Sequence, residues 1–179
     1  CDEAHSRGKR VYLTCNTLPH NDEIVHLEQF VNDALAAGVD AMIANDIGVF
    51  SLIKKYAPDM EIHVSTQAGI VNYVTANEFY NMGAKRVVLA RELSLEEIRV
   101  IRRDTPPELE LETFAHWAMC VSYSGRCLLS NYMTGRDSNR GACAQPCRMQ
   151  YSMGGRMDEY PLSLRDNCLA DYLQQLEDA

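Results

Sequence analysis

Short apolar runs rich in β-branched residues recur along the first two thirds of the chain. They occupy residues 10–15, 41–44, 61–66, 86–90 and 110–114. Each run is too short for an independent helix, and its composition is typical of a buried strand. The hydrophobic pattern therefore predicts five strands.

Between these runs, apolar residues recur at the three- and four-residue spacing of amphipathic helices. Residues 21–37 form one such stripe, for which Asn21 or Asp22 is the predicted N-cap and Gly38 the end. A second predicted helix, 69–82, ends at Gly83. A third, 95–103, follows Ser94, and Glu97 completes a capping box.

The same unit occurs twice at an interval of 45 residues, where a glycine that ends a helix precedes a buried strand at residues 38–44 and again at 83–90. Two βα units of about 22 residues fit this interval, and repeated units of this kind favour a parallel sheet, either a (β/α) barrel or an open doubly wound sheet. A complete barrel needs about 250 residues. We therefore expect an α/β fold, a partial TIM-like barrel built by residues 1–119. Residues 120–179 would add a cysteine- and arginine-rich segment to the same domain and end in a helix.

Composition places the chain among globular domains. Of its 179 residues, 46% are hydrophobic and 23% charged, which provides enough apolar surface for a core. No apolar run has the length of a membrane span, and the first ten residues are too charged for a signal peptide. We expect a cytoplasmic protein with no membrane partner. The chain also starts without Met and ends within a predicted helix, which suggests a fragment of something longer.

Cysteines are concentrated in the last third of the chain. Cys120, Cys127, Cys143 and Cys147 follow a Cys-x6-Cys-x15-Cys-x3-Cys pattern, and Cys168 comes later. Thiolates are soft ligands for iron–sulfur clusters, zinc or copper. Structural zinc usually takes closely spaced cysteine pairs, whereas these long gaps suit ligands from separate loops. An iron–sulfur centre is the first interpretation, and zinc, disulfides or unused thiols are the alternatives.

The same stretch is basic although the chain as a whole is acidic. The net charge of the chain is −8, which argues against RNA binding by the whole surface. Residues 120–157, however, carry five arginines and a single acid: Arg126, Arg136, Arg140, Arg148, Arg156 and Asp137. Arginine suits paired contacts with phosphate or carboxylate groups. These arginines would bind an anionic substrate or RNA, or alternatively offset the charge of a thiolate-bound cluster.

Polar residues follow the predicted strands, where a parallel sheet forms its active face. They are Asn16, Asn45, Asp46, Ser65, Thr66, Gln67, Arg91, Glu92 and His116. His116 and Glu112 are catalytic candidates because they lie near Cys120 in the sequence. His63 alternates with two apolar neighbours, so it is either a substrate contact inside a barrel or a hydrogen-bonded buried histidine. Trp117 is either a stacking platform for a base or a cover over apolar surface.

Several common catalytic motifs are absent. The sequence has no Gly-x-Gly-x-x-Gly or Walker loop, and no Gly-x-Ser-x-Gly or His-Glu-x-x-His motif. A nucleotide-cofactor enzyme, a serine hydrolase and a zinc protease therefore find no support. A cysteine protease that pairs a thiol with His116 or His63 is the main enzymatic competitor.

Residues 112–130 resemble the signature of peptidase family U32, the collagenase-like proteins. The matching positions are Glu112, Phe114, Ala118, Cys120, Gly125, Cys127 and Ser130, and the departure is Trp117, where the family has glycine. The resemblance extends to most of the chain and is greatest to the branch that hydroxylates the wobble uridine of transfer RNA.

This resemblance implies a barrel-like, oxygen-independent RNA hydroxylase with a 4Fe-4S cluster on Cys120, Cys127, Cys143 and Cys168, or with Cys147 as the fourth ligand. It also implies prephenate, a small anionic substrate, as the hydroxyl source. Arg126 and Arg148 are the expected anion contacts because they flank the thiols in the sequence. His63 and Gln67 would contact substrate, and His116 would relay protons. A collagenase-like peptidase, a noncatalytic subunit and a ubiquinone-pathway hydroxylase are the alternatives within the family.

Overall fold

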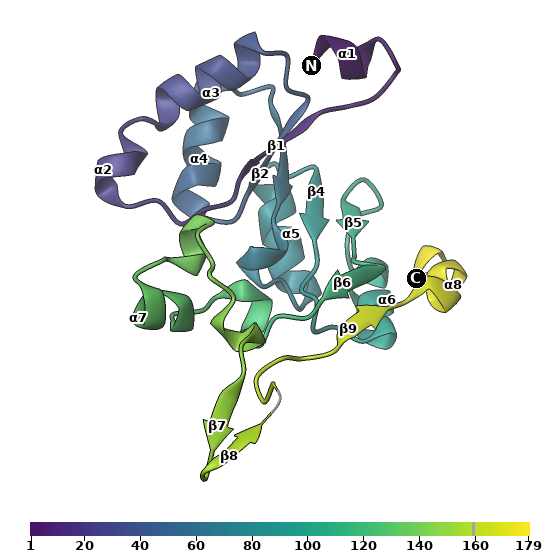
Figure 1. Ribbon diagram of the computed structural model, residues 1–179. Coiled ribbons are helices and arrows are strands. Elements are labelled where there is room, and N and C mark those ends of the chain that lie inside the picture. Colours follow the sequence, from purple (N-terminus) through teal and green to yellow (C-terminus); the bar gives the residue numbers. More distant parts are fainter. Residues whose placement is uncertain (159) are drawn as a thin grey trace.

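A five-stranded parallel sheet forms the centre of the computed structural model, which describes residues 1–158 and 160–179. The strands lie in the order β1–β2–β3–β4–β5 (Figure 1). Their bounds are β1 Tyr12–Cys15, β2 Ala41–Ala44, β3 Glu61–Val64, β4 Arg86–Val88 and β5 Glu110–Glu112. All five strands lie within the predicted runs, and the parallel α/β architecture is confirmed.

The strand order is sequential along the whole sheet. A doubly wound sheet instead reverses its order at a switch point. Residues of α3 to α6 and of one face of the sheet also belong to a single apolar cluster, so these helices pack on the same face. The sheet is therefore singly wound, as the barrel alternative requires. Its edge strands are β1 and β5, and closure into a barrel stays a prediction.

Four helices connect the strands: α3 Leu27–Ala36, α4 Ile47–Tyr56, α5 Tyr73–Asn81 and α6 Leu95–Arg103. Asp46 caps α4 by accepting a hydrogen bond from the Val49 amide at 2.9 Å. The capping box predicted for α6 is present, because the Ser94 amide donates to the Glu97 carboxylate at 2.7 Å and the Glu97 amide donates back to the Ser94 hydroxyl. Short α1 (Asp2–His5) precedes the sheet.

Two predicted helix boundaries are wrong. The stripe at 21–37 forms two helices, α2 (Asn21–Ile24) and α3, and the N-cap of α2 is His20. A contact that is distant in sequence, the ion pair of Glu23 with Arg140, holds the short α2. The helix predicted from residue 69 begins at Tyr73, because Gly69 adopts a left-handed conformation (φ 72°) after the 3-10 turn η1 (Thr66–Ala68).

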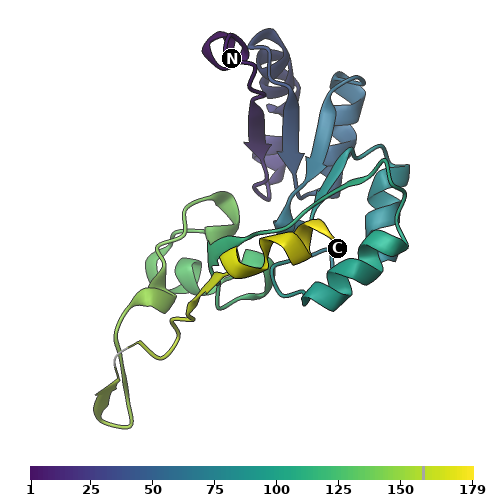
Figure 2. The same cartoon turned by 90° about the vertical axis from the view of Figure 1, so that its right-hand side faces the viewer.

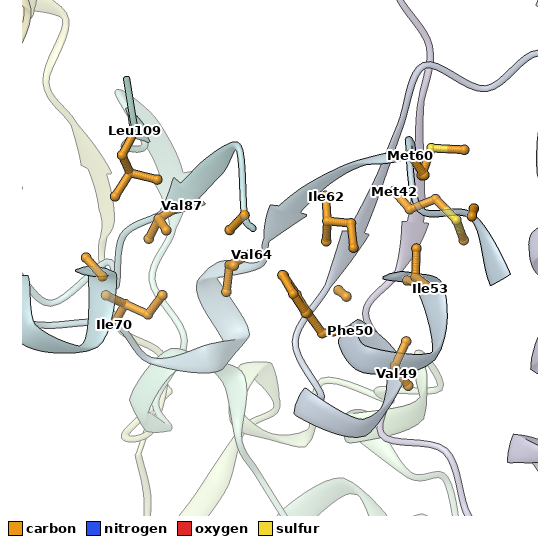
Figure 3. Packing of buried hydrophobic residues seen from close by; sticks show 14 of the residues in the cluster. Met42, Val49, Phe50, Ile53, Met60, Ile62, Val64, Ile70, Val87 and Leu109 are labelled. Carbon is orange, nitrogen blue, oxygen red and sulfur yellow. The ribbon is translucent and has the colours of Figure 1, made fainter. Parts of the chain in front are cut away.

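The hydrophobic core lies between the sheet and its helices (Figure 3). Val49, Phe50 and Ile53 of α4 face Met42 and Ile62 of the sheet, and all five side chains are at most 1% exposed. Each such side chain contributes about 1.5–3 kcal/mol through burial. His63 lies on the other face of the sheet, as its alternation predicted.

The remaining elements are β6 His116–Ala118, η2 Tyr123–Gly125, α7 Leu129–Thr134, η3 Ser138–Arg140, η4 Pro146–Arg148, β7 Tyr151–Met153, β8 Arg156–Asp158, β9 Asp166–Cys168, η5 Ala170–Tyr172 and α8 Leu173–Glu177. Strands β6 and β9 pair antiparallel, and the β7–β8 hairpin projects away from the sheet in both views (Figures 1 and 2). Among the described residues, no helix is both long and apolar enough to cross a membrane.

Candidate metal centre

The chain between β5 and α8, residues 113–172, contains the five clustered cysteines and is called the cysteine segment below. It is attached to the loops that follow the strands of the sheet. The Ser124 amide donates to the Glu92 carboxylate after β4 at 2.6 Å, and Arg126 Nε donates to the Gln67 carbonyl after β3 at 3.1 Å. The segment therefore lies at the carboxyl ends of the strands, where parallel α/β proteins form their active face.

A third attachment joins the segment to the loop after β1. The Leu18 amide donates to the Asn139 carbonyl at 3.0 Å, and Arg140 pairs with the Glu23 carboxylate and donates to His20 Nδ1 at 3.1 Å. The pKa of Glu23 is lowered, first by the hydrogen bond from the His20 amide and then by Arg140. Arg140 is thus bound to α2 and its N-cap, which leaves it a structural role.

Backbone amides support two of the thiols in the same way. The Leu129 amide donates to Cys127 Sγ at 3.3 Å, and the Gln145 amide donates to Cys143 Sγ, also at 3.3 Å. The pKa of Cys127 is lowered, first by a hydrogen bond from the Ser122 side chain and then by the amides that follow it. Hydrogen bonds of this kind stabilise a thiolate and tune the potential of iron–sulfur clusters.

Four thiols of the segment lie close enough to influence one another. The pKa of Cys147 is raised, first by burial, and the charges of Cys120, Cys143 and Cys127 raise it further, while Arg148 lowers it. Four potential ligands separated by up to 15 intervening residues are therefore brought together by the fold. This convergence is what a metal centre needs, because all its ligands must reach one inorganic group.

The fold holds these thiol loops through two polar side chains. Ser130 is fully buried, donates to the Arg136 carbonyl at 2.7 Å and accepts from the Ala144 amide at 2.9 Å, so it joins α7 to the Cys143 loop. Arg148 donates to the carbonyls of Met119 at 2.9 Å and Leu164 at 2.6 Å, which joins the Cys147 turn to the residue before Cys120.

Cys168 occupies a different position. It lies on β9 opposite His116 of β6, and three residues, Trp117, Ala118 and Met119, separate His116 from Cys120 along the chain. Cys168 is exposed, and its charge is not among those that act on Cys147. Outside the segment, burial raises the pKa of Cys15 to about 11, as expected for an apolar thiol in the core.

The thiol spacing bears on the kind of metal. Tetrahedral zinc with Zn–S bonds of about 2.3 Å brings its sulfur ligands to within about 4 Å of one another. In the part of the chain that the structure describes, only His20, Asp22 and Glu23 form a group of three ligating atoms within 4.8 Å, and no three thiols do. A polynuclear cluster, in which each thiolate binds its own iron, accepts thiols that lie further apart.

The residues predicted to be catalytic or to contact substrate lie in varied settings. His63 is 1% exposed and packs edge-on against Tyr12, with 4.7 Å between the ring centroids, and burial lowers its pKa. Glu112 pairs with Arg86 at 2.9 Å on β5. His116 is exposed on β6. Gln67, which follows β3, lies against Arg126 of the cysteine segment.

Sequence reasoning missed the side chains that position the thiol loops. Glu92 accepts from both the amide and the hydroxyl of Ser124, which itself has a left-handed conformation (φ 47°). Asn139 and Ser138 donate to the Cys127 carbonyl. Glu92 was visible as a polar residue after a strand, but nothing in the sequence indicates its partner.

The chain resembles several known proteins. It is 43% identical over 152 residues to the Escherichia coli "tRNA hydroxylation protein P". The aligned residues make up 85% of this chain and 33% of that protein. It is 39% identical over 182 residues to the E. coli 23S rRNA 5-hydroxycytidine synthase (98% and 27%) and 32% identical over 190 residues to the "Collagenase" of Porphyromonas gingivalis (97% and 45%). The chain thus spans from about a quarter to just under half of these relatives.

A solved structure, that of the U32 peptidase Mk0906, has the same fold, with a TM-score of 0.54 and 23% sequence identity over 66% of this chain and 50% of that one. The sequence pattern of peptidase family U32 matches residues 1–179. A match along the whole sequence, supported by relatives above 30% identity, identifies the chain as a member of peptidase family U32.

Proposed function

We propose that the chain is part of an RNA hydroxylase whose activity depends on an iron–sulfur cluster held by the cysteine segment. The observation that carries the proposal is the convergence of four thiols at the carboxyl ends of the strands. Two relatives with different RNA substrates in their names, a tRNA hydroxylation protein and a 5-hydroxycytidine synthase, support this class of reaction.

Cys120, Cys127 and Cys143 would bind three corners of a 4Fe-4S cluster. The fourth ligand is either Cys168, which the family resemblance favours, or Cys147, whose thiol lies beside the other three. The amides that donate to Cys127 and Cys143 would stabilise these ligands as thiolates. Zinc is the alternative metal, and the wide spacing of the thiols argues against it.

The reaction we propose replaces a C–H bond of an RNA base by C–OH, with the wobble uridine of transfer RNA as the substrate and prephenate as the oxygen-independent source of the hydroxyl group. This change is a two-electron oxidation of the base, and it balances if prephenate is also the oxidant, so that a C–OH bond of prephenate becomes C–H while the C–H bond of the base becomes C–OH. The cluster would supply electron transfer. The chain's own residues would hold the cluster, admit the base at the end of the sheet and bind the small anionic substrate.

Single cysteine replacements test the metal centre. The intact protein is purified anaerobically with Cys127→Ser, Cys147→Ser or Cys168→Ser, and with Cys1→Ser as a control at an exposed cysteine outside the segment. We expect Cys127→Ser to lose iron and visible absorbance, one of the other two to do the same, and Cys1→Ser to keep both. Full retention of iron in Cys127→Ser, or zinc in place of iron, would contradict the proposal.

The reaction itself is tested by mass spectrometry of transfer-RNA nucleosides from cells that lack the gene. We expect 5-hydroxyuridine to disappear, to return with the intact gene and to stay absent with the Cys127→Ser gene. The collagenase-like relative supplies the competing activity, proteolysis. Gelatin digestion that persists after the iron is removed, with unchanged transfer RNA, would replace the hydroxylase proposal by a peptidase.

A further inference from the structure

A small cavity lies beside the cysteine segment, between α6 and α8. Its volume is about 280 Å³, just below the usual range for small-molecule sites. Most of its wall is apolar and includes Leu95, Ile98 and Leu176 of the two helices and Leu169 after β9. The indole ring of Trp117 completes the wall. It is backed by Phe114, whose ring centroid lies 6.0 Å from that of Trp117.

Arg91 brings a positive charge to this cavity. It follows β4 and lines the cavity, and its Nε is buried without a hydrogen-bond partner. Among the described residues, the guanidinium group makes no hydrogen bond and no ion pair; its one cation–π contact is with the Phe114 ring, at 5.8 Å. The neighbouring carboxylate, Glu92, forms no ion pair with Arg91, and its two oxygens accept from the amide and the hydroxyl of Ser124.

Three of the five arginines of the basic stretch are engaged in contacts within the protein, and Arg136 is exposed on the surface. Arg148 donates to three protein oxygen atoms, Arg140 pairs with Glu23, and Arg126 donates to the Gln67 carbonyl. Their guanidinium groups hold the cysteine segment together. The side chain of Arg156 lies outside the described residues. Arg91 differs because its buried Nε–H has no hydrogen-bond partner. A buried donor without a partner destabilises the protein, and a bound acceptor would remove that cost.

Arg91 also lies close to the thiol loop. Its Nη2 atom is 3.3 Å from the place where a Cβ on Gly125 would lie, two residues before Cys127. Gly125 has φ +79° and no side chain, so it lets the guanidinium approach the backbone there. A molecule bound to Arg91 would therefore lie next to the segment that we propose to hold the cluster.

We propose that this cavity binds a small carboxylate with a ring-shaped apolar body, and that Arg91 is its anion contact. The carboxylate would accept from the guanidinium, and the ring would lie against Trp117 and the leucines of α6 and α8. Thr113, Asn167 and Gln175 also line the cavity and offer hydrogen bonds to a second polar group. This inference rests on the proposed function, because the ligand would be the small anionic substrate of the hydroxylase.

Calorimetric titration of the cluster-loaded protein with prephenate tests the site. Arg91→Met keeps the bulk of the side chain and removes its charge, whereas Gln175→Trp adds bulk at the exposed edge of the cavity and leaves Arg91 in place. We expect both variants to bind prephenate at least tenfold more weakly. Arg99→Met is the matched control, because Arg99 is an α6 arginine that pairs with Glu96 and does not line the cavity.

Iron content and melting temperature verify that each variant is folded and loaded. Benzyl alcohol, a ring without a carboxylate, should not bind measurably. Unchanged prephenate affinity in Arg91→Met, or no binding to the wild type, would overturn the inference. Transfer-RNA analysis separates the binding site from the hydroxylase proposal. If Arg91→Met cells contain normal 5-hydroxyuridine and the variant binds prephenate as the wild type does, only the binding site is refuted. Binding that depends on Arg91 in a protein that leaves RNA unmodified upholds the site and refutes the hydroxylase.

Discussion

Replacing Ser130 by alanine tests how the fold holds the thiol loops. Ser130 of α7 is fully buried and joins this helix to the Cys143 loop, because its hydroxyl donates to the Arg136 carbonyl and accepts from the Ala144 amide. In Ser130→Ala, the Arg136 carbonyl and the Ala144 amide each lose their bond to this hydroxyl. A polar group left buried without a partner costs about 1–3 kcal/mol. Arg136 is exposed, so water can replace the bond to its carbonyl, and we expect the free energy of unfolding to fall by about 1–3 kcal/mol.

Urea unfolding of the cluster-free protein, followed by circular dichroism, measures this loss without a contribution from metal binding. The loaded protein gives a second measurement. Because Ala144 follows Cys143 directly, we expect Ser130→Ala to lose iron to a chelator several-fold faster than the wild type does. Both effects come from one hydroxyl group, so they should appear together.

Ser51→Ala provides the matched control. Ser51 is exposed on α4 and donates only to the Ile47 carbonyl within its own helix, at 2.9 Å. Its loss should change the free energy of unfolding by less than about 0.5 kcal/mol and leave iron retention unchanged. If Ser130→Ala behaved like Ser51→Ala in both measurements, the proposed link between α7 and the Cys143 loop would be wrong.

Three further changes have defined outcomes. Ser94→Ala removes the capping box of α6 and should lower the free energy of unfolding by about 1 kcal/mol in urea titrations, a loss absent from Ser51→Ala. Burial lowers the pKa of His63, so stability should be complete above about pH 6.5 and fall as the pH drops further; His63→Phe should flatten that slope between pH 7.5 and 5.5. Glu92→Gln weakens the charge-assisted hydrogen bond to Ser124 and should speed chelator removal of iron while the far-ultraviolet spectrum is unchanged.

The strands were predictable because their signal is local. Ile62 and Val64 alternate with His63, and the same alternation sets which side chains face the helices. Helix ends were predictable where a cap lies in the adjacent sequence, as at Ser94. The break after α2 was not, because Glu23 is held by Arg140, a residue more than one hundred positions away.

Part of the candidate site was predictable from residue types, and part depends on contacts between residues that are distant in the sequence. The number of cysteines and the long gaps between them indicate a metal centre, and the fold brings four of these cysteines together. Charge alone, however, does not show which arginine is available to a ligand. Arg148 stands out in the sequence beside a cysteine, but its guanidinium group binds protein oxygens; Arg91, outside the basic segment, has the buried donor without a partner.

The position of α8 explains why the βα repeat becomes hard to follow after β5. The Leu169 amide donates to the Ala115 carbonyl at 2.7 Å, and β9 pairs with β6, so the cysteine segment leaves the sheet and returns to almost the same point. Beyond that point α8 packs beside α6 and β5, where Leu176 contacts the core. It is the helix expected after β5, delayed by the segment. The thiol loops are therefore an insertion within one βα unit, which places four thiols at the carboxyl ends of the strands and leaves the order of the sheet intact.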